Sequence, residues 1–327
     1  MTSTRVVPVP ALRLIVAGAT RAPSVHNTQP WRWRATARTL ELHADRTRSL
    51  PATDPEGRNL VISCGAALHH AQVVAGALGW ATLVDRHPDP DRPDLLARLE
   101  LSPAPPSPHG ADVLAAVEER CTDRRRFTSW PVPEERLDHL ATVANQWGTR
   151  ATALTDVTER FLAERLVLRA GEIQRGNQGA MSEQAAWLER SAVDGIPVAA
   201  LEDSGRGSGA RTHRFEAAPP HLGVEEPDVQ GSDGLVALYA AHDDPTTWLR
   251  AGEGLSALWL TATRSGLSVV PLSQVIEVEQ TRRAFRAEVL GGLAEPLVLV
   301  RVGWQAMNRG RLPRTPRRSV GEVLQVR

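Results

Sequence analysis

The sequence predicts an α+β protein built from two similar halves, each with an apolar helix at its centre. With 327 residues, 42% of them hydrophobic and 23% charged, the chain is long enough for two domains or for one domain of two similar halves. Residues 58–78 are mostly small and apolar and end at Gly79, which predicts a helix packed on nearly all sides. Strand-like and helix-like segments alternate on both sides of it, which favours mixed sheets with central helices.

A matched spacing of glycines indicates the internal duplication. Gly65 and Gly79 are 14 residues apart (79 − 65), and so are Gly252 and Gly266 (266 − 252). Apolar residues then fall at corresponding positions in the two helices, and each helix follows an Asp-Pro step: Leu68 with Leu255, Ala71 with Leu258, Ala75 with Ala262, and Asp54-Pro55 with Asp244-Pro245. One match could arise by chance, but the similar strand and helix order around it favours a repeat.

Local signals set the elements of the first half. Proline ends the first helix, alternation of large and basic residues indicates a hairpin, and Gly79 ends the central helix before two further strands. The expected elements are a helix over 11–21, strands over 31–36 and 40–44, a helix over 58–78, and strands over 80–84 and 95–101. The proline-rich stretch 104–108 is the best linker, so we expect one half over 1–103 and the other over 104–327.

The second half repeats the pattern after this linker. The expected elements are helices over 111–120, 134–146 and 157–173, a strand over 151–154, a strand over 235–241, a helix over 245–265, a strand over 267–272, a helix over 278–289 and a strand over 297–302. Residues 174–229 are rich in Gly, Ser, Glu and Arg and hold one helical patch, 181–191. We interpret this stretch as an insertion over the surface, either a lid or an insertion without a mechanistic role.

Composition excludes several classes of function. All 38 basic residues are arginines, so lysine Schiff-base chemistry and a P-loop are excluded, and an anion site must use guanidinium or backbone N–H groups. The formal net charge is zero, so we expect neither nucleic acid nor a membrane as partner. Cys64 and Cys121 lack metal-ligand spacing, so no metal is expected, and a cytoplasmic location fits.

The most informative stretch is the turn over residues 22–31, Ala-Pro-Ser-Val-His-Asn-Thr-Gln-Pro-Trp. Its two prolines fix φ and push the preceding residues toward extended geometry, which predicts a stiff, non-helical turn. Such a turn can direct Ser24, Asn27 and Gln29 at one flat polar edge of a ligand. The alternative is an ordinary loop between a helix and a strand.

This turn resembles the A-P-S-x-x-N-x-Q-P-W signature of the nitroreductase-like FMN oxidoreductases. The stretch Arg120-Cys121-Thr122-Asp123-Arg124 is similar to the family's R-x-S/T-x-R/K motif, and residues 315–320 resemble its C-terminal basic motif. Ordinary members carry the arginine motif first and the Pro-Trp turn later, whereas here the order is reversed. The chain therefore resembles a fused pseudo-dimer, as in actinobacterial proteins of the Acg type, with a nitroreductase-like fold in each half.

The resemblance implies one FMN per chain in the seam between the halves. The residues that it assigns to the cofactor are Ser24, His26, Asn27, Gln29, Arg120, Thr122, Arg124, Pro271, Leu272, Ser273, Arg317 and Arg318. In this assignment Arg120 and Arg317 or Arg318 hold the phosphate, Thr122 adds a hydroxyl, and Arg124 stabilises negative charge on the reduced ring. Residues of the turn and of 271–274 contact the ring.

Each assignment has an alternative. Arg120 and Arg124 could form structural ion pairs, and Arg317 and Arg318 could belong to a merely basic tail. His26 is a candidate proton donor or a packing residue. Other residues are interpreted as non-functional: Trp31 and Trp33 as core, Arg125 and Arg126 as solvated charges, Cys64, His69 and His70 as no metal or thiol site, and Gly205–Gly209 as no phosphate loop.

The function expected from the resemblance is an FMN-dependent oxidoreductase that takes hydride from NAD(P)H and passes electrons to a small electrophile such as a nitroaromatic or quinone. The alternative is a flavin-sequestering protein whose insertion blocks the nicotinamide. A third possibility is a biosynthetic dehydrogenase with an open cleft. We expect a monomeric pseudo-dimer or a weak homodimer.

Overall fold

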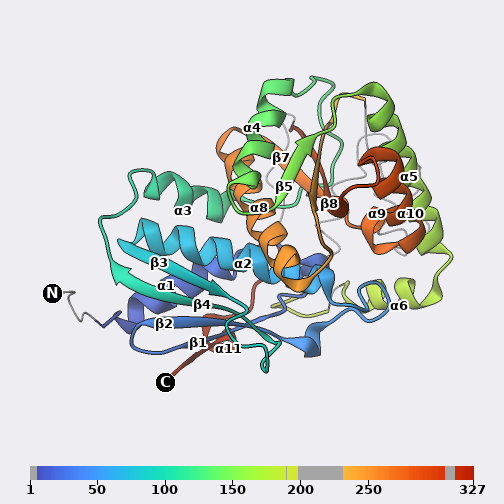
Figure 1. The fold of residues 1–327 in the computed structure, drawn as a ribbon. Helices are drawn as coiled ribbons and strands as arrows, with labels where there is room; N and C mark the ends of the chain where they lie inside the picture. Colours follow the sequence, from blue (N-terminus) through green and yellow to red (C-terminus); the bar gives the residue numbers. More distant parts are fainter. Residues whose placement is uncertain (1–5, 189, 198–230, 306–313) are drawn as a thin grey trace.

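The computed structural model describes residues 6–188, 190–197, 231–305 and 314–327. It confirms an α+β fold in which two mixed units share a helical centre (Figure 1). Each half contributes one sheet, and the two long apolar helices α2 and α8 lie between them (Figure 1). The insertion beyond residue 197 and the glycine-rich stretch 205–209 lie outside the described residues.

The first half closely follows the expected order. Its elements are α1 (Val9–Ala19), the short 3-10 turns η1 (Val25–Asn27) and η2 (Arg46–Arg48), α2 (Arg58–Ala77), and strands β1 (Trp31–Ala35), β2 (Thr39–Ala44), β3 (Trp80–Arg86) and β4 (Leu95–Pro103). Strand β1 pairs antiparallel with β2, and β4 lies between β2 and β3.

The second half departs from expectation in three places. Its elements are α3 (Gly110–Glu119), α4 (Glu134–Asn145), β5 (Arg150–Ala153), α5 (Val157–Arg175), α6 (Gln178–Ala186), β6 (Gly234–Ala240), α8 (Pro245–Arg264), β7 (Leu267–Pro271), α9 (Gln274–Glu277), α10 (Glu279–Ala284), η5 (Phe285–Val289), β8 (Glu295–Trp304), α11 (Val320–Val323) and β9 (Leu324–Val326). The helix expected over 278–289 is confirmed, because α10 continues directly into η5, but η5 has π geometry. The short α9 before it was not expected, and the extended Val278 separates it from α10. The helical patch expected over 181–191 is shifted, since α6 ends at Ala186.

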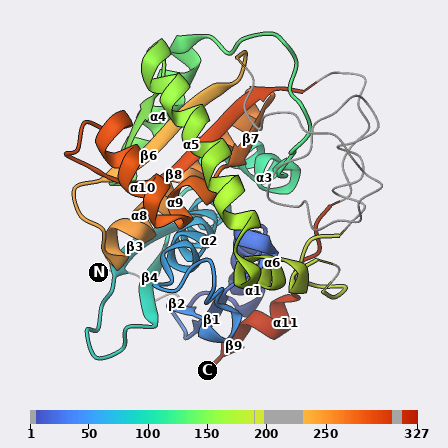
Figure 2. The same cartoon turned by 90° about the vertical axis from the view of Figure 1, so that its right-hand side faces the viewer.

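The third departure is the C-terminus, for which the sequence indicated no strand. Strand β9 pairs in parallel with β1, with Trp33 opposite Leu324, and completes a sheet of order β3-β4-β2-β1-β9. Figure 2 shows β1 and β9 side by side, close to the end of the chain. The other sheet, of order β5-β6-β8-β7, contains only second-half strands. The last residues of the chain therefore pack on the first half.

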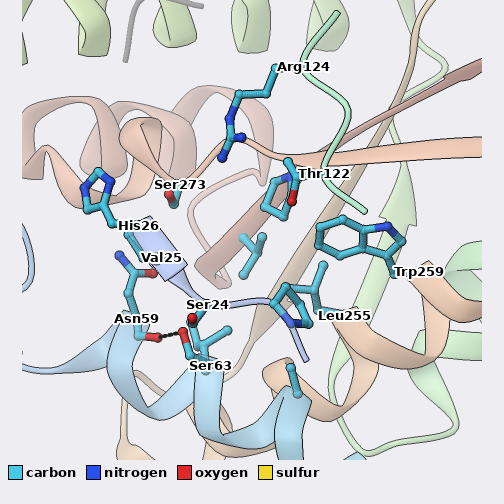
Figure 3. Close-up of a pocket in the computed structure, with 15 residues that line it drawn as sticks. Ser24, Val25, His26, Asn59, Ser63, Thr122, Arg124, Leu255, Trp259 and Ser273 are labelled. Atoms are coloured by element: carbon cyan, nitrogen blue, oxygen red, sulfur yellow. Dashed lines mark hydrogen bonds between the residues drawn. The ribbon is translucent and has the colours of Figure 1, made fainter. Parts of the chain in front are cut away.

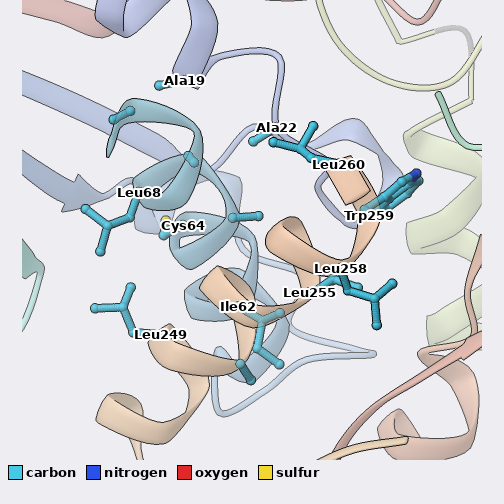
Figure 4. Packing of buried hydrophobic residues seen from close by; sticks show 14 of the residues in the cluster. Ala19, Ala22, Ile62, Cys64, Leu68, Leu249, Leu255, Leu258, Trp259 and Leu260 are labelled. Atoms are coloured by element: carbon cyan, nitrogen blue, oxygen red, sulfur yellow. The ribbon is translucent and has the colours of Figure 1, made fainter. Parts of the chain in front are cut away.

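Helices α2 and α8 cross at two glycines, and this contact is reciprocal. A Cβ on Gly65 would lie 2.0 Å from the carbonyl oxygen of Leu249, and one on Gly252 would lie 2.0 Å from that of Ile62. Both pairs are related by the same offset (252 − 65 = 187; 249 − 62 = 187), so the predicted duplication is confirmed as a pseudo-two-fold relation. Figure 4 shows Ile62 and Leu255 on the two helices near this crossing.

Both faces of the second-half sheet are buried. Val236 and Leu238 of β6 face the central core around α2 and α8, whereas Leu235 and Ala237 face a second core against α5. Such burial on two faces explains the nearly continuous apolar runs of β6 and β8. Trp31 and Trp33 are fully buried, which confirms their assignment to the core.

Helix α2 is long and apolar enough to cross a membrane, but 78% of its most apolar window is buried inside the protein. This agrees with its predicted place at the centre of the fold. Its start is stabilised by Asp54, whose carboxylate accepts from the backbone N–H groups of Asn59 and Leu60. Asp244 serves α8 in the same way through a capping box with Thr247.

The glycine crossing predicts opposite effects for two Gly→Ala changes. Gly252→Ala should lower the free energy of unfolding by roughly 1–3 kcal/mol or more, because the added methyl group must push the two backbones apart. Gly76 lies half-buried near the end of α2, and a Cβ added there would meet no atom within 4 Å, so Gly76→Ala should raise stability by about 0.5–1 kcal/mol. Denaturant unfolding measures both, and equal effects would contradict the crossing.

Candidate functional site

A pocket lies in the seam between the halves and encloses about 610 Å³, counting its part open to solvent. We call it the seam pocket, and Figure 3 shows the side chains that line it. It is lined by Pro23, Ser24, Val25, His26, Asn59, Ile62, Ser63 and Ala66 from the first half and by Thr122, Arg124, Leu255, Trp259, Pro271, Ser273 and Val298 from the second.

Residues 120–125 separate the seam pocket from a second cavity. Thr122 pairs with Val269 of β7 in an isolated bridge, so the segment runs extended beside the sheet. Thr122 and Arg124 therefore face the seam pocket, while Cys121, Asp123 and Arg125 line the other side. This alternation is what an extended backbone imposes.

The second cavity, which we call the arginine groove, holds Arg120 and Arg317. It is lined by Arg21, Val117, Glu118, Glu119, Arg120, Cys121, Asp123, Arg125, Ser268, Gln305, Arg314, Thr315 and Arg317. Trp259 adjoins both cavities, because it lines the seam pocket and the centroid of its ring lies 4.6 Å from the guanidinium carbon of Arg120.

Within the described residues, Arg120 and Arg317 carry buried donors without acceptors. Arg120 donates one hydrogen bond to the carbonyl of Arg21, while its Nε and Nη1 and the Nε of Arg317 find no partner in the described part of the chain. Two of the groove's three acids pair with other arginines, Glu118 with Arg21 and Arg314, and Asp123 with Arg125. Buried charged donors left in this way are costly unless an anion meets them.

The electrostatics of the two arginines agree with this. Burial lowers the pKa of Arg120 to about 10 and that of Arg317 to about 9, the latter also through repulsion by Arg120. Both remain charged at neutral pH, because these values lie well above 7. The alternative role of Arg120, in a structural ion pair, is not observed, because Arg120 forms no ion pair with any of the described residues.

The turn predicted to be stiff is held in an unusual conformation. His26, Asn27 and Gln29 have φ values of 50°, 55° and 49°, in the left-handed region, and Val25–Asn27 forms one 3-10 turn. Non-glycine residues adopt this region at a cost of order 1–3 kcal/mol each when the surroundings hold them there. Ser24 contributes by accepting a hydrogen bond from the backbone N–H of Gln29.

The amides of Asn27 and Gln29 hold other segments rather than line the seam pocket. Asn27 Nδ2 donates to the carbonyls of Gly195 and Pro316, and Gln29 Nε2 donates to that of Val193. Arg317 donates to Asn27 Oδ1 at 2.9 Å. The turn thereby joins the C-terminal tail to the segment 190–197.

The predicted residues therefore divide into groups. Six of them line the seam pocket, namely Ser24, His26, Thr122, Arg124, Pro271 and Ser273. Two others, Arg120 and Arg317, line the arginine groove. Arg318 donates to the carbonyls of Gln29 and Trp31 and lies 3.7 Å from Asp45, away from both cavities. Leu272 is buried, and its backbone N–H donates to the carbonyl of Leu299. For these residues the cofactor assignment stays a prediction.

The interpretation of Arg125 as a solvated charge is wrong. Its side chain is buried and donates to both oxygens of the Asp123 carboxylate, and Arg301 donates to its backbone carbonyl. Arg125 therefore fixes the backbone beside Arg124. A run of three arginines in the sequence does not reveal which of them is buried. Paired and hydrogen-bonded charges of this kind can be buried without a large penalty.

Six pocket residues were missed because they belong to the two apolar helices. Asn59, Ile62, Ser63 and Ala66 lie on α2, and Leu255 and Trp259 lie on α8. Positions 59, 62, 63 and 66 follow helical spacing and so share one face. The sequence offered one signal for this part of the pocket: Asn59 and Ser63 are polar residues on a helix face that was expected to be buried.

The seam position related to the pocket by the pseudo-two-fold is filled. Adding the offset of 187 takes Ala66 to Glu253, and subtracting it takes Trp259 to Gln72. Glu253 is fully buried, pairs with Arg86 at 2.7 Å and accepts a hydrogen bond from Gln72 at 2.7 Å. At this related position, the larger polar side chains therefore fill the space that in the seam pocket is left open beside the small Ala66.

No family model matches the chain, but several curated proteins do. The Mycobacterium tuberculosis protein "Putative NAD(P)H nitroreductase Rv3131" is 38% identical over 319 residues, which cover 96% of this chain and 91% of that protein. "Putative NAD(P)H nitroreductase acg" from the same species is 33% identical, covering 94% and 93%. "Probable NAD(P)H nitroreductase PigM" of Serratia is 25% identical, covering 96% and 93%.

Among solved structures, the FMN-dependent nitroreductase NfnB of Mycobacterium smegmatis, in complex with NADPH, has 19% identity and a TM-score of 0.39 and covers 63% of this chain and 94% of that one. The FMN- and NADPH-dependent nitroreductase NfnB from sphigopyxis sp. strain HMH has 18% identity and a TM-score of 0.43, and covers 65% of this chain and 97% of that one.

The similarity to the curated relatives extends over both halves and nearly their whole length. The chain therefore belongs to the NAD(P)H nitroreductase family. Its relatives include the Acg protein, which confirms the resemblance to proteins of the Acg type that the order of the motifs indicated.

Asp54, at the start of α2, makes the free energy of unfolding depend on pH. Burial, aided by the nearby Glu277, raises its pKa to about 6, although two backbone N–H groups oppose the shift. Since the unfolded value is near 4, the protonated form favours folding, and this stabilisation is lost as the pH rises through about 6. Relative to Asp54→Asn, the unfolding free energy of the wild type should fall by roughly 1 kcal/mol between pH 5 and 7.5. Chemical denaturation of both proteins measures this, and a difference that does not vary with pH would contradict it.

Proposed function

We propose that this protein is an FMN-dependent oxidoreductase that takes electrons from NAD(P)H and passes them to a small electrophile such as a nitroaromatic or a quinone. The observation that carries the proposal is the pair Arg120 and Arg317, whose buried donors find no acceptor among the described residues and lie in a groove next to the seam pocket. A phosphate dianion matches two guanidinium groups in charge and in hydrogen-bonding geometry.

The residues present fit the cofactor at both of its ends. Arg120 and Arg317 would hold the phosphate in the arginine groove. The Gln305 side chain lines the same groove, and its amide atoms likewise have no partner among the residues that the structure describes. Thr122 and Ser24 would offer hydroxyl groups in the seam pocket, and Pro271 and Ser273 line its far wall.

FMN, when bound, supplies hydride acceptance and the onward transfer of electrons. The chain's own residues supply position and charge. Arg124 faces the seam pocket, and a fixed guanidinium there stabilises negative charge that develops on a bound ring. His26 lines the same pocket and remains the candidate to deliver a proton to a substrate.

We propose one cofactor per chain. The support is the asymmetry of the two seam positions, because Glu253, Arg86 and Gln72 fill the position that corresponds to the seam pocket. The proposed partners are small molecules, the proposed state is a monomeric pseudo-dimer or a weak homodimer, and the cytoplasmic location stays a prediction.

The phosphate assignment predicts a selective loss of FMN binding. Arg120→Gln should weaken FMN binding by about 10- to 100-fold, since a charge-assisted hydrogen bond contributes about 1.5–3 kcal/mol. Arg317→Gln should act similarly, whereas Arg13→Gln on the exposed face of α1 is the matched control and should bind as the wild type does. Fluorescence titration of the apoprotein measures affinity and stoichiometry together.

Thermal unfolding of the apoproteins checks that each variant is folded. Unchanged affinity in both groove variants would remove the arginines from the site, and a ratio of two FMN per chain would contradict the single site.

A flavin-sequestering function is the second candidate, and the segment 190–197 favours it. Asp194 pairs with Arg48. The carbonyls of Val193 and Gly195 accept hydrogen bonds from the turn residues Gln29 and Asn27, so this segment is bound to the turn. Glu183 of α6 is fastened to the first half as well, through the backbone of Ala52 and Thr53. A fastened cover would limit access for a nicotinamide.

Stopped-flow spectroscopy separates the two functions. For the oxidoreductase, anaerobic mixing with NADPH or NADH should bleach the flavin absorbance within seconds, and a nitroaromatic or quinone should restore it. Dithionite serves as the control that reduces the flavin in either case. Bleaching by dithionite alone, with neither nicotinamide effective, would favour sequestration and contradict the oxidoreductase.

A further inference from the structure

We propose that Glu277 is a positioning residue, which orients the Asn59 amide so that the seam pocket presents a hydrogen-bond acceptor to the donor N–H of the flavin ring. The inference rests on the proposed function. It concerns two residues from different halves, neither of which the motifs of the sequence include.

Asn59 is buried on the first turn of α2 and lines the seam pocket. Its Nδ2 donates to Glu277 Oε1 at 3.2 Å. An ionised carboxylate only accepts hydrogen bonds, so it selects the NH₂ side of the amide and leaves the oxygen on the other side. Figure 3 shows this amide at the pocket wall, close to Val25 and His26.

Glu277 is itself held in place. Its second oxygen accepts from Gln174 Nε2 at 2.7 Å, which ties it to α5. It closes the short helix α9, which starts directly after the pocket residue Ser273. The carboxylate thus reaches across the seam from the segment that forms one pocket wall and fixes a residue in the opposite wall.

The orientation of Asn59 has a chemical consequence for the ligand. The oxidised isoalloxazine ring carries one N–H donor, the imide at N3, while its other edge heteroatoms accept hydrogen bonds. A buried acceptor in the wall requires such a donor, because an unmet polar group in a pocket disfavours binding. Asn59 would therefore select a ring that presents an imide N–H.

A purely structural role for Glu277 would tie α2, α5 and α9 together without affecting the ligand. Glu277→Gln separates the two roles, because a glutamine can donate to the Asn59 oxygen and allow the amide to turn over. Glu279→Gln is the matched control: it removes the same charge two residues away, where the carboxylate is exposed and paired with Arg283.

The test titrates each apoprotein with FMN and with 3-methyl-FMN, which lacks the imide hydrogen. The wild type and Glu279→Gln should bind 3-methyl-FMN at least tenfold more weakly than FMN. Glu277→Gln should bind FMN about tenfold more weakly than the wild type, and its preference for FMN over the methyl analogue should fall at least threefold. A wild type without this preference, or a Glu277→Gln variant that keeps it in full, overturns the proposal.

A second measurement does not depend on the flavin. The side-chain ¹⁵N signal of Asn59, identified by its loss in Asn59→Asp, should exchange its hydrogens faster in Glu277→Gln than in the wild type or Glu279→Gln. Unchanged exchange overturns the role of Glu277 even if FMN binds. Changed exchange in a protein that fails to bind FMN would refute the proposed function and the selection of the flavin, but would support the orientation of Asn59.

Discussion

The close approach of two helix backbones at Gly65 and Gly252 is the constraint on which the rest of the molecule depends. With no side chain between them, each glycine faces a carbonyl of the other helix, Leu249 or Ile62. This contact fixes the distance between the halves, and with it the width of the seam where α2 and α8 line the pocket. Because proteins are close-packed, such a contact sets the geometry of the adjoining pocket, whose residues Ile62 and Ala66 lie within one turn of Gly65.

The seam is symmetric in backbone but not in chemistry. On one side Ala66 and Trp259 leave a pocket, and on the other Glu253 and Gln72, with Arg86, fill the corresponding space. A duplicated fold thereby has one open site and one closed by a satisfied polar cluster. A buried carboxylate is acceptable there because it has a guanidinium and an amide as partners.

Charge and strain are concentrated around the open site. Arg120 and Arg317 keep buried donors that meet no acceptor among residues 6–188, 190–197, 231–305 and 314–327, and the adjoining turn holds His26, Asn27 and Gln29 at positive φ. The tail secures that turn, since Arg317 and Arg318 contact Asn27 and Gln29 before β9 joins the first-half sheet. The C-terminus thus contributes to the fold of the first half and to the arginine groove at once.

The sequence by itself determined the elements that depend on local chemistry. Glycine spacing gave the duplication, apolar continuity gave α2, and the prolines of 22–31 gave the turn, because each of these acts within a few residues. The motif around Arg120 and the turn at Ser24 were also sufficient to place residues from both halves at one pocket.

Only the tertiary structure decided what depends on distant partners. Three features rest on contacts with partners that no sequence pattern named: the direction of the Asn27 and Gln29 amides, the burial of Arg125 beside Arg301, and the pairing of β9 with β1. Asn59 belongs with them, since Glu277 lies 218 residues further along the chain. Side-chain orientation is set by whichever donor or acceptor the fold brings within reach, and sequence spacing does not encode that distance.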